Sequence, residues 1–116
     1  MAELPELQGP YEILDLPDRG SIRLRVRGWI HGRVTIHPKY PGAPEEKEVE
    51  ALRLQLVEGY KATPPHYYDV TAKTLIYQLL PVLQRPDYSS FELGITKYGV
   101  APRARFTVEV TPIAKT

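Results

Sequence analysis

Arginines alternate with aliphatic residues in the stretch 19–39, RGSIRLRVRGWIHGRVTIHPK, which carries six lysines or arginines and no acid. Because successive residues of a strand point to opposite faces, Ile22, Leu24 and Val26 are expected on one face and the arginines between them on the other. The basic candidates of this stretch are Arg23, Arg25, Arg27, Arg33 and Lys39. Such a row suits a polyanionic partner. The alternative is a solvated outer face whose arginines pair with carboxylates elsewhere.

Flat side chains accompany these cations. Tyrosine occurs eight times and phenylalanine only twice, and tyrosine is preferred where one edge of a ring stays wet. Binding of single-stranded nucleic acid needs a cationic groove for the phosphates and rings that stack on the bases. The aromatic candidates are Trp29, Tyr40, Tyr60, Tyr67, Tyr68 and Tyr98, and the further basic candidates are Lys97, Arg103 and Arg105. For each tyrosine, packing at the edge of the core is the alternative.

Trp29 has two interpretations. It falls on the parity of the arginines, which makes it a stacking platform on the cationic face. Gly28, however, interrupts the strand pattern and suggests a β-bulge. A bulge would reverse the parity and place Trp29 in the core.

The elements that must position these residues begin with two β-runs, 21–30 and 32–37, folded back on each other through residues 29–32. A third strand is expected over 49–58, because Leu52, Leu54 and Leu56 recur at the spacing of one strand face. Residues 59–69, with two prolines and several aromatics, are expected to form a loop.

A helix is expected over 70–83, with Asp69 or Thr71 as its N-cap. Pro81 removes a backbone donor and should kink or end the helix near Leu80. A closing hairpin follows, with a turn within 98–102. Its core-facing residues are expected to be Phe91, Leu93, Ile95, Phe106, Val108 and Val110.

This order, β-β-β-α-β-β, predicts an α+β fold that is mainly β with one helix, and it favours a five-stranded OB-like barrel. The OB-fold is a partly open Greek-key barrel that binds oligonucleotides or oligosaccharides. Residues 1–18 are predicted to form an acidic N-terminal arm, since they carry five acids and no base. Residues 19–112 are predicted to form a single β-barrel-like domain, and 113–116 a tail. The charge of the arm suggests that it covers the arginine face when no ligand is bound.

The last hairpin, FELGITKYGVAPRARFTVEV, resembles that of small single-stranded-DNA-binding proteins of viruses, plasmids and thermophilic microbes. In that family a hydrophobic strand ending in a Lys/Arg-x-Gly turn often leads to a strand that opens with Arg and an aromatic residue. The resemblance spans about a fifth of the chain. It implies sequence-tolerant binding of single strands without a cofactor.

Several kinds of chemistry are not supported by the residues. Cysteine is absent, which excludes thiolate metal sites and disulfides and suits a cytoplasmic protein. His31 and His37 lack the partners of a metal site. No nucleophile, P-loop or dinucleotide motif occurs. The chain is therefore predicted not to be an enzyme and to have no catalytic residues, no metal and no cofactor.

Composition adds two expectations. No apolar run approaches the length of a membrane span, and the acidic start does not resemble a signal peptide. The absence of Asn, the single Met and the twelve prolines are typical of proteins from thermophiles.

The sequence thus predicts non-catalytic binding of single-stranded nucleic acid, with single-stranded DNA as the expected ligand, through a basic sheet face and tyrosine-rich loops. The alternative is a structural or assembly subunit of a viral or multi-protein complex, which would pair with its neighbours by strand addition. A homodimer or higher oligomer stays open in either case.

Overall fold

Two three-stranded antiparallel sheets and one α-helix make up the computed structural model, which describes residues 4–37, 41–100 and 103–113. The first sheet has the order β1-β5-β6, with β1 at Ser21–Leu24, β5 at Phe91–Tyr98 and β6 at Arg105–Pro112. The second has the order β2-β3-β4, with β2 at Val26–Ile36, β3 at Lys47–Leu56 and β4 at Tyr67–Val70. The prediction of a mainly β chain with one helix is confirmed.

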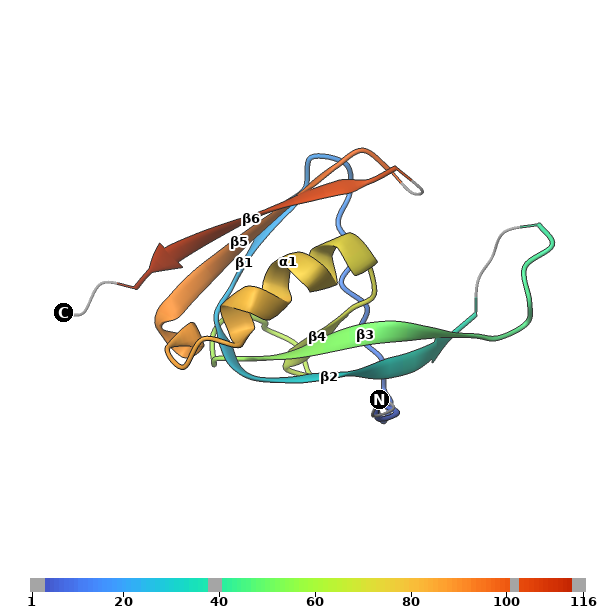
Figure 1. Cartoon of the computed structure of the whole chain (residues 1–116), viewed down its shortest axis with the longest axis horizontal. Coiled ribbons are helices and arrows are strands. Elements are labelled where there is room, and N and C mark those ends of the chain that lie inside the picture. The colour runs from blue at the N-terminus through green and yellow to red at the C-terminus, as the bar shows by residue number, and fades with distance from the viewer. Residues whose placement is uncertain (1–3, 38–40, 101–102, 114–116) are drawn as a thin grey trace.

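The helix α1, Lys73–Leu83, lies between the two sheets, followed by a short 3-10 helix, η1, at Tyr88–Ser90 (Figure 1). The sheets do not close into a barrel, because β4 and β6 are end strands that do not pair with each other. The strand order is β-β-β-β-α-β-β, so neither the five-stranded barrel nor its predicted element order is confirmed.

Leucine and isoleucine side chains fill the space between the sheets and the helix. Leu24 of β1, Leu52 of β3, Ile76 of α1 and Leu93 of β5 are all fully or almost fully buried in one cluster. The alternation of β1 produces this arrangement, since Ile22 and Leu24 pair with the inward residues of β5. The predicted core positions of the closing hairpin are also confirmed, because Phe91, Leu93 and Ile95 are buried. The predicted residues of the last strand pack against the same core but stay half-buried: Phe106, Val108 and Val110.

No turn forms at residues 29–32, so the predicted first hairpin is wrong. β2 runs straight through this region and pairs with β3 along its length, with Trp29 opposite Leu54 and Gly32 opposite Ala51. The segment has no proline, asparagine or aspartate to favour a tight turn. Gly32 has another role: a Cβ there would lie 2.5 Å from the carbonyl oxygen of Pro5, so the glycine admits the N-terminal arm.

The predicted irregularity at Gly28 is confirmed as a register shift between Val26 and Gly28. The shift reverses the parity of β2 after the bulge. Trp29 and Arg33 therefore share a face with Leu54 and Glu50 of β3. The four strand arginines do not form one face, because Arg33 lies on the opposite side of the strand from the position that simple alternation predicts.

α1 begins later than predicted. Its N-cap is Ala72, which makes no side-chain cap, and neither Asp69 nor Thr71 caps the helix. Asp69 is instead a residue of β4, a four-residue strand that takes the end of the predicted loop and the first residue of the predicted helix. Pro81 lies within the helix, which ends at Leu83 as the predicted range has it, so of the two effects expected of this proline an end near Leu80 is wrong. The apolar face is confirmed by the burial of Leu75, Ile76, Leu79 and Leu83.

The N-terminal arm, residues 4–16, crosses the face of the second sheet that is turned away from α1. It forms parallel bridges with the free edges of that sheet, from Glu6 to Arg33 of β2 and from Ile13 to Asp69 of β4. Leu7 of the arm is only 4% exposed, over Val34 and Ala51. The described part of the arm thus covers the β2–β3–β4 sheet and not Arg23, Arg25 or Arg27, contrary to the prediction.

Candidate nucleic-acid interface

Three of the predicted arginines stay together on the outer side of the bend from β1 to β2. Only Arg25 separates the two strands, so the chain passes from one sheet to the other at this residue. Arg23 and Arg27 are exposed on either side of it, while Leu24 and Val26 between them are buried. We call Arg23, Arg25 and Arg27 the arginine ridge.

The acceptors of these side chains determine how much charge the ridge retains. The Nε atom of Arg25 donates to the carbonyl oxygen of Ser89 at 2.8 Å, and that of Arg27 donates to the carbonyl oxygen of Leu56 at 3.2 Å. Arg23 alone makes an ion pair, with Glu92 at 3.3 Å, and its side chain is 81% exposed. Within the described residues neither Arg25 nor Arg27 has a carboxylate partner. Carboxylates of the described residues therefore do not neutralise the charges of Arg25 and Arg27.

Tyr60 is the predicted aromatic residue that lies beside the ridge. Its hydroxyl group donates to Oε2 of Glu92 at 2.8 Å, and the other oxygen of Glu92 accepts from Arg23. This hydrogen bond, with a smaller contribution from burial, raises the pKa of Tyr60 above its ordinary value of 10.0. The ring is half-buried, so one tyrosine is held in place next to the cations.

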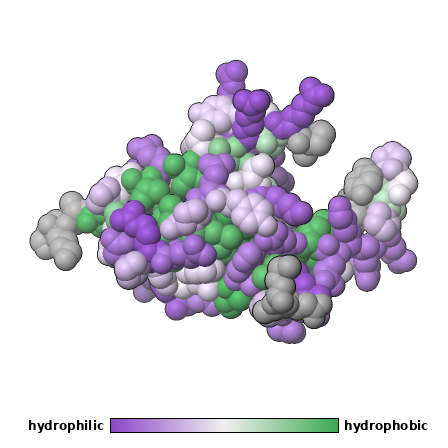
Figure 2. Space-filling model, in the orientation of Figure 1, coloured by the Kyte–Doolittle hydropathy of each residue, from purple (hydrophilic) through white to green (hydrophobic). Residues whose placement is uncertain are grey.

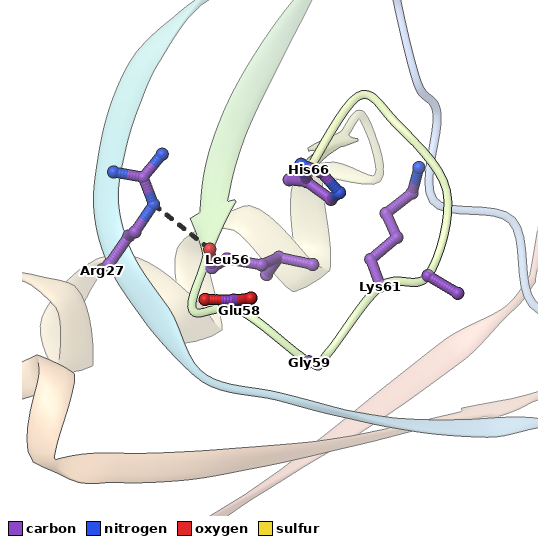
Figure 3. Close-up of a pocket in the computed structure, with 7 residues that line it drawn as sticks. Arg27, Leu56, Glu58, Gly59, Lys61 and His66 are labelled. Carbon is purple, nitrogen blue, oxygen red and sulfur yellow. Dashed lines mark hydrogen bonds between the residues drawn. The ribbon is translucent and has the colours of Figure 1, made fainter.

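A pocket of about 510 Å³ adjoins the ridge at Arg27. In Figure 3, Arg27 comes from β2, whereas Glu58, Gly59, Lys61 and His66 come from the loop between β3 and β4 that encloses the other side. Pockets of roughly 300–1,000 Å³ are usual for small ligands. The lining offers the guanidinium of Arg27, the ring of His66 and the carboxylate of Glu58, whereas the amine of Lys61 is used within the protein.

Lys61 is a residue of this pocket that the sequence analysis did not single out. Its side chain is 5% exposed and lies 3.5 Å from the carboxylate of Glu12 in the arm. Its amine also donates to the carbonyl oxygens of Thr63 and Pro65. Lys61 therefore holds the loop in a closed shape and ties it to the arm, while His66, on the same loop, is exposed.

Two predicted stacking residues of β4 lie away from the ridge. The ring of Tyr67 lies under the guanidinium of Arg53 at 4.1 Å, and its hydroxyl group donates to the carbonyl oxygen of Pro10 in the arm. Tyr68 packs against the main core, with the amine of Lys61 at 5.2 Å from its ring. Trp29 also packs against that core, which is the second of its two interpretations.

A buried ion pair on β3 and β4 has no counterpart in the sequence analysis. Arg53 donates to both carboxylate oxygens of Asp69, at 2.7 and 3.2 Å, and the backbone N–H of Glu12 donates to the same carboxylate at 3.0 Å. Asp69 is fully buried. Hydrogen bonding to Asp69 raises the pKa of Arg53. A buried charge requires such a partner, so the pair fixes the arm to the sheet.

The remaining predicted residues form other groups. Arg33 pairs with Glu48 of β3. Tyr98 and Arg105 are cross-strand partners at the turn of the closing hairpin, with Lys97 and Arg103 nearby in the chain. Tyr98, Arg103 and Arg105 are exposed. Lys39 and Tyr40 lie outside the described residues.

Across residues 4–37, 41–100 and 103–113, no three His, Asp or Glu side chains gather in a way that could hold a metal ion. In these ranges no helix has the length and apolar character needed to cross a membrane.

Comparison with known proteins gives no relative: no family model matches the chain, and neither a curated protein nor a solved structure is significantly similar to it.

Proposed function

We propose that this protein binds single-stranded nucleic acid, with single-stranded DNA as the expected ligand, without catalysis and without a cofactor. The observation that carries the proposal is the bonding of Arg25 and Arg27 to carbonyl oxygens. These contacts hold the guanidinium groups in place and leave their charge available. A line of fixed cations along one strand suits a linear polyanion.

The residues beside the arginine ridge complete the proposed interface. The sugar-phosphate backbone of the nucleic acid runs along the arginine ridge and reaches the pocket beside Arg27, where the exposed His66 adds a hydrogen-bonding ring. Tyr60 provides a ring next to Arg23 and Arg25 on which a base can stack, a contact worth about 1–3 kcal/mol. The partner is recognised by charge and stacking, so binding is tolerant of sequence.

The two sheets can also be described as parts of one five-stranded sheet. When β1 and β2 are taken as one strand bent at Arg25, five strands remain, in the order β-β-β-α-β-β along the chain. Their spatial order is then β4-β3-β2/β1-β5-β6. We propose that this is an OB-like barrel left open between β4 and β6, with α1 packed against β6 and the core between the sheets.

The test is the binding of a labelled single-stranded 25-mer, followed by fluorescence anisotropy over a salt series. Counterion release lowers the slope of log K against log salt by about 0.7 for each phosphate contact. Arg25→Ala and Arg27→Ala should each remove about 0.7 from that slope and weaken binding about fivefold at 0.1 M salt. Tyr60→Phe keeps the ring and should leave the slope unchanged, whereas Tyr60→Ala should weaken binding at all salt concentrations.

Lys73→Ala is the matched control. Lys73 is an exposed cation at the start of α1, away from the ridge, and its removal changes the net charge by the same amount. It should lower neither the affinity nor the slope by more than a small fraction. A salt-independent affinity in the wild type, or equal losses in Lys73→Ala and Arg27→Ala, would refute the proposed interface.

The second candidate function is that of an assembly subunit. The observation that favours it is the position of β6 at the end of its sheet, with one edge unpaired by any described strand. Absence of nucleic-acid binding together with salt-insensitive self-association would make this the better account.

A further inference from the structure

The free edge of β6 presents a defined set of backbone groups. The carbonyl oxygen of Phe106 accepts from the side chain of Gln78 at 2.9 Å, so it points away from β5. The N–H of Ile113 instead donates toward β5, to the carbonyl oxygen of Ser90. Because backbone groups alternate along a strand, those of Phe106, Val108 and Val110 point to the free edge. The hydrogen bonds of the β5–β6 ladder use the residues between them.

The side chains of β6 alternate in the same way between two faces. Arg105, Thr107 and Glu109 are exposed on the outer face, and Phe106 and Val108 on the inner face are half-buried. Figure 2 shows hydrophobic side chains at the surface over β6 and α1. An edge of this length without a partner strand is a template for pairing.

We propose that β6 pairs antiparallel with β6 of a second copy of this chain, about a two-fold axis at Thr107. In this register Arg105 of each copy lies opposite Glu109 of the other. Phe106 of each copy lies opposite Val108 of the other, and these two residues exchange N–H and C=O groups. The two sheets thereby join into one continuous sheet of six strands, since each copy contributes three.

The charges of Arg105 and Glu109 favour this register over those with the two-fold axis at a neighbouring residue. An axis at Glu109 places the two copies of that carboxylate opposite each other, which is unfavourable. An axis at Val108 places Arg105 opposite Thr111 and Glu109 opposite Thr107, so neither charge has a direct partner. A register shifted by a single residue reverses the faces of one strand. The axis at Thr107 alone pairs both charges and keeps the apolar side chains on one face.

Gln78 does not prevent this pairing. A carbonyl oxygen has two lone pairs, so that of Phe106 can accept from Gln78 within its own chain and from Val108 of the second copy. A C₂ interface of this kind is self-complementary, because the same segment serves both subunits.

The test is sedimentation equilibrium over a concentration series, with charge reversals at the two positions. Arg105→Glu and Glu109→Arg should each weaken self-association roughly tenfold or more, since each variant places like charges opposite each other at two sites of the interface. An equimolar mixture of the two variants should associate as strongly as the wild type, because every Glu then faces an Arg. The double variant R105E/E109R should recover self-association by itself.

Two further variants separate the edge from general effects. Lys73→Glu reverses an exposed charge on α1 and should leave association unchanged. Val108→Pro removes an N–H group from the free edge and none from the β5–β6 ladder, so it should abolish the dimer in a protein with a wild-type circular dichroism spectrum. A monomeric wild type at millimolar concentration, or no recovery in the mixture of the two charge variants, would overturn the proposal.

Discussion

Replacement of Asp69 by alanine tests how the N-terminal arm and the second sheet are held together. Asp69 is fully buried and accepts two hydrogen bonds from Arg53 and one from the backbone of Glu12. Arg53 is 8% exposed and has the ring of Tyr67 against its guanidinium. Its charge therefore has little access to water once the carboxylate is removed.

The expected loss of stability follows from the buried Arg53, which Asp69→Ala leaves without its carboxylate partner. Removal of one partner from a buried ion pair destabilises a protein by about 3–5 kcal/mol, because the other charge stays buried without compensation. A domain of ordinary stability unfolds with about 5–15 kcal/mol, so Asp69→Ala should remove a large part of the free energy of unfolding. Urea denaturation, followed by circular dichroism at neutral pH, measures this difference.

Two further variants make the result specific. Asp87→Ala removes a half-exposed carboxylate that pairs with the half-exposed Arg85, and it should cost less than about 1 kcal/mol. In the double variant R53M/D69A neither charge of this pair remains, so about 2 kcal/mol of the loss should be recovered. If Asp69→Ala costs no more than Asp87→Ala, or the double variant is no more stable than Asp69→Ala, the pair does not hold the arm as described.

Three other outcomes are expected. Gly32→Ala should undock the arm, since its Cβ would lie 2.5 Å from the backbone oxygen of Pro5; hydrogen exchange should then be faster at the N–H of Leu7, and unchanged protection there would contradict this. Deletion of residues 1–18 should lower the free energy of unfolding without tightening nucleic-acid binding, because the arm does not cover the arginine ridge; a gain in affinity by anisotropy would show that it does. Tyr60 has a raised pKa, so its hydrogen bond with Glu92 stabilises the fold fully below pH 10.0, and this contribution is lost as the pH rises through the higher pKa of the folded state. In an ultraviolet titration of tyrosinate, the difference between wild type and Tyr60→Phe should therefore have its midpoint above pH 10.0, and a midpoint at or below that value would contradict the hydrogen bond.

Local patterns predicted those parts of the fold that depend on local sequence. The leucines of β3 and the apolar face of α1 lie where their spacing indicates, and the bulge at Gly28 agrees with the glycine in the strand pattern. The errors occur where a distant segment decides the structure. Gly32 is a glycine because Pro5 approaches it, and Asp69 is a strand residue because Arg53 and the arm bind it. The spacing of residue types along the sequence does not reveal such long-range contacts.

The candidate site shows the same division. Alternation placed Arg23 and Arg27 on the outer side of the chain and Leu24 and Val26 inside, as the structure has them. Whether a given arginine pairs with a carboxylate depends on which carboxylate the fold brings near it. Tyr67 and Tyr68 have the composition of a binding loop but belong to a short strand packed between the arm and the core. Lys61 was missed because only the closed loop between β3 and β4 brings its acceptors together.

The arm described above holds both outer edges of the β2–β3–β4 sheet, at Arg33 and at Asp69. An open strand edge is a site of aggregation that natural proteins protect. The arm precedes both of its partners in the chain, yet its contact with β4 requires a segment more than fifty residues later, as the hydrogen bond from Glu12 to Asp69 shows. Until β4 has formed, the edge of this sheet opposite β2 is unprotected. Substitutions that weaken the docking of the arm should therefore reduce the yield of folded protein through aggregation before they abolish the fold itself.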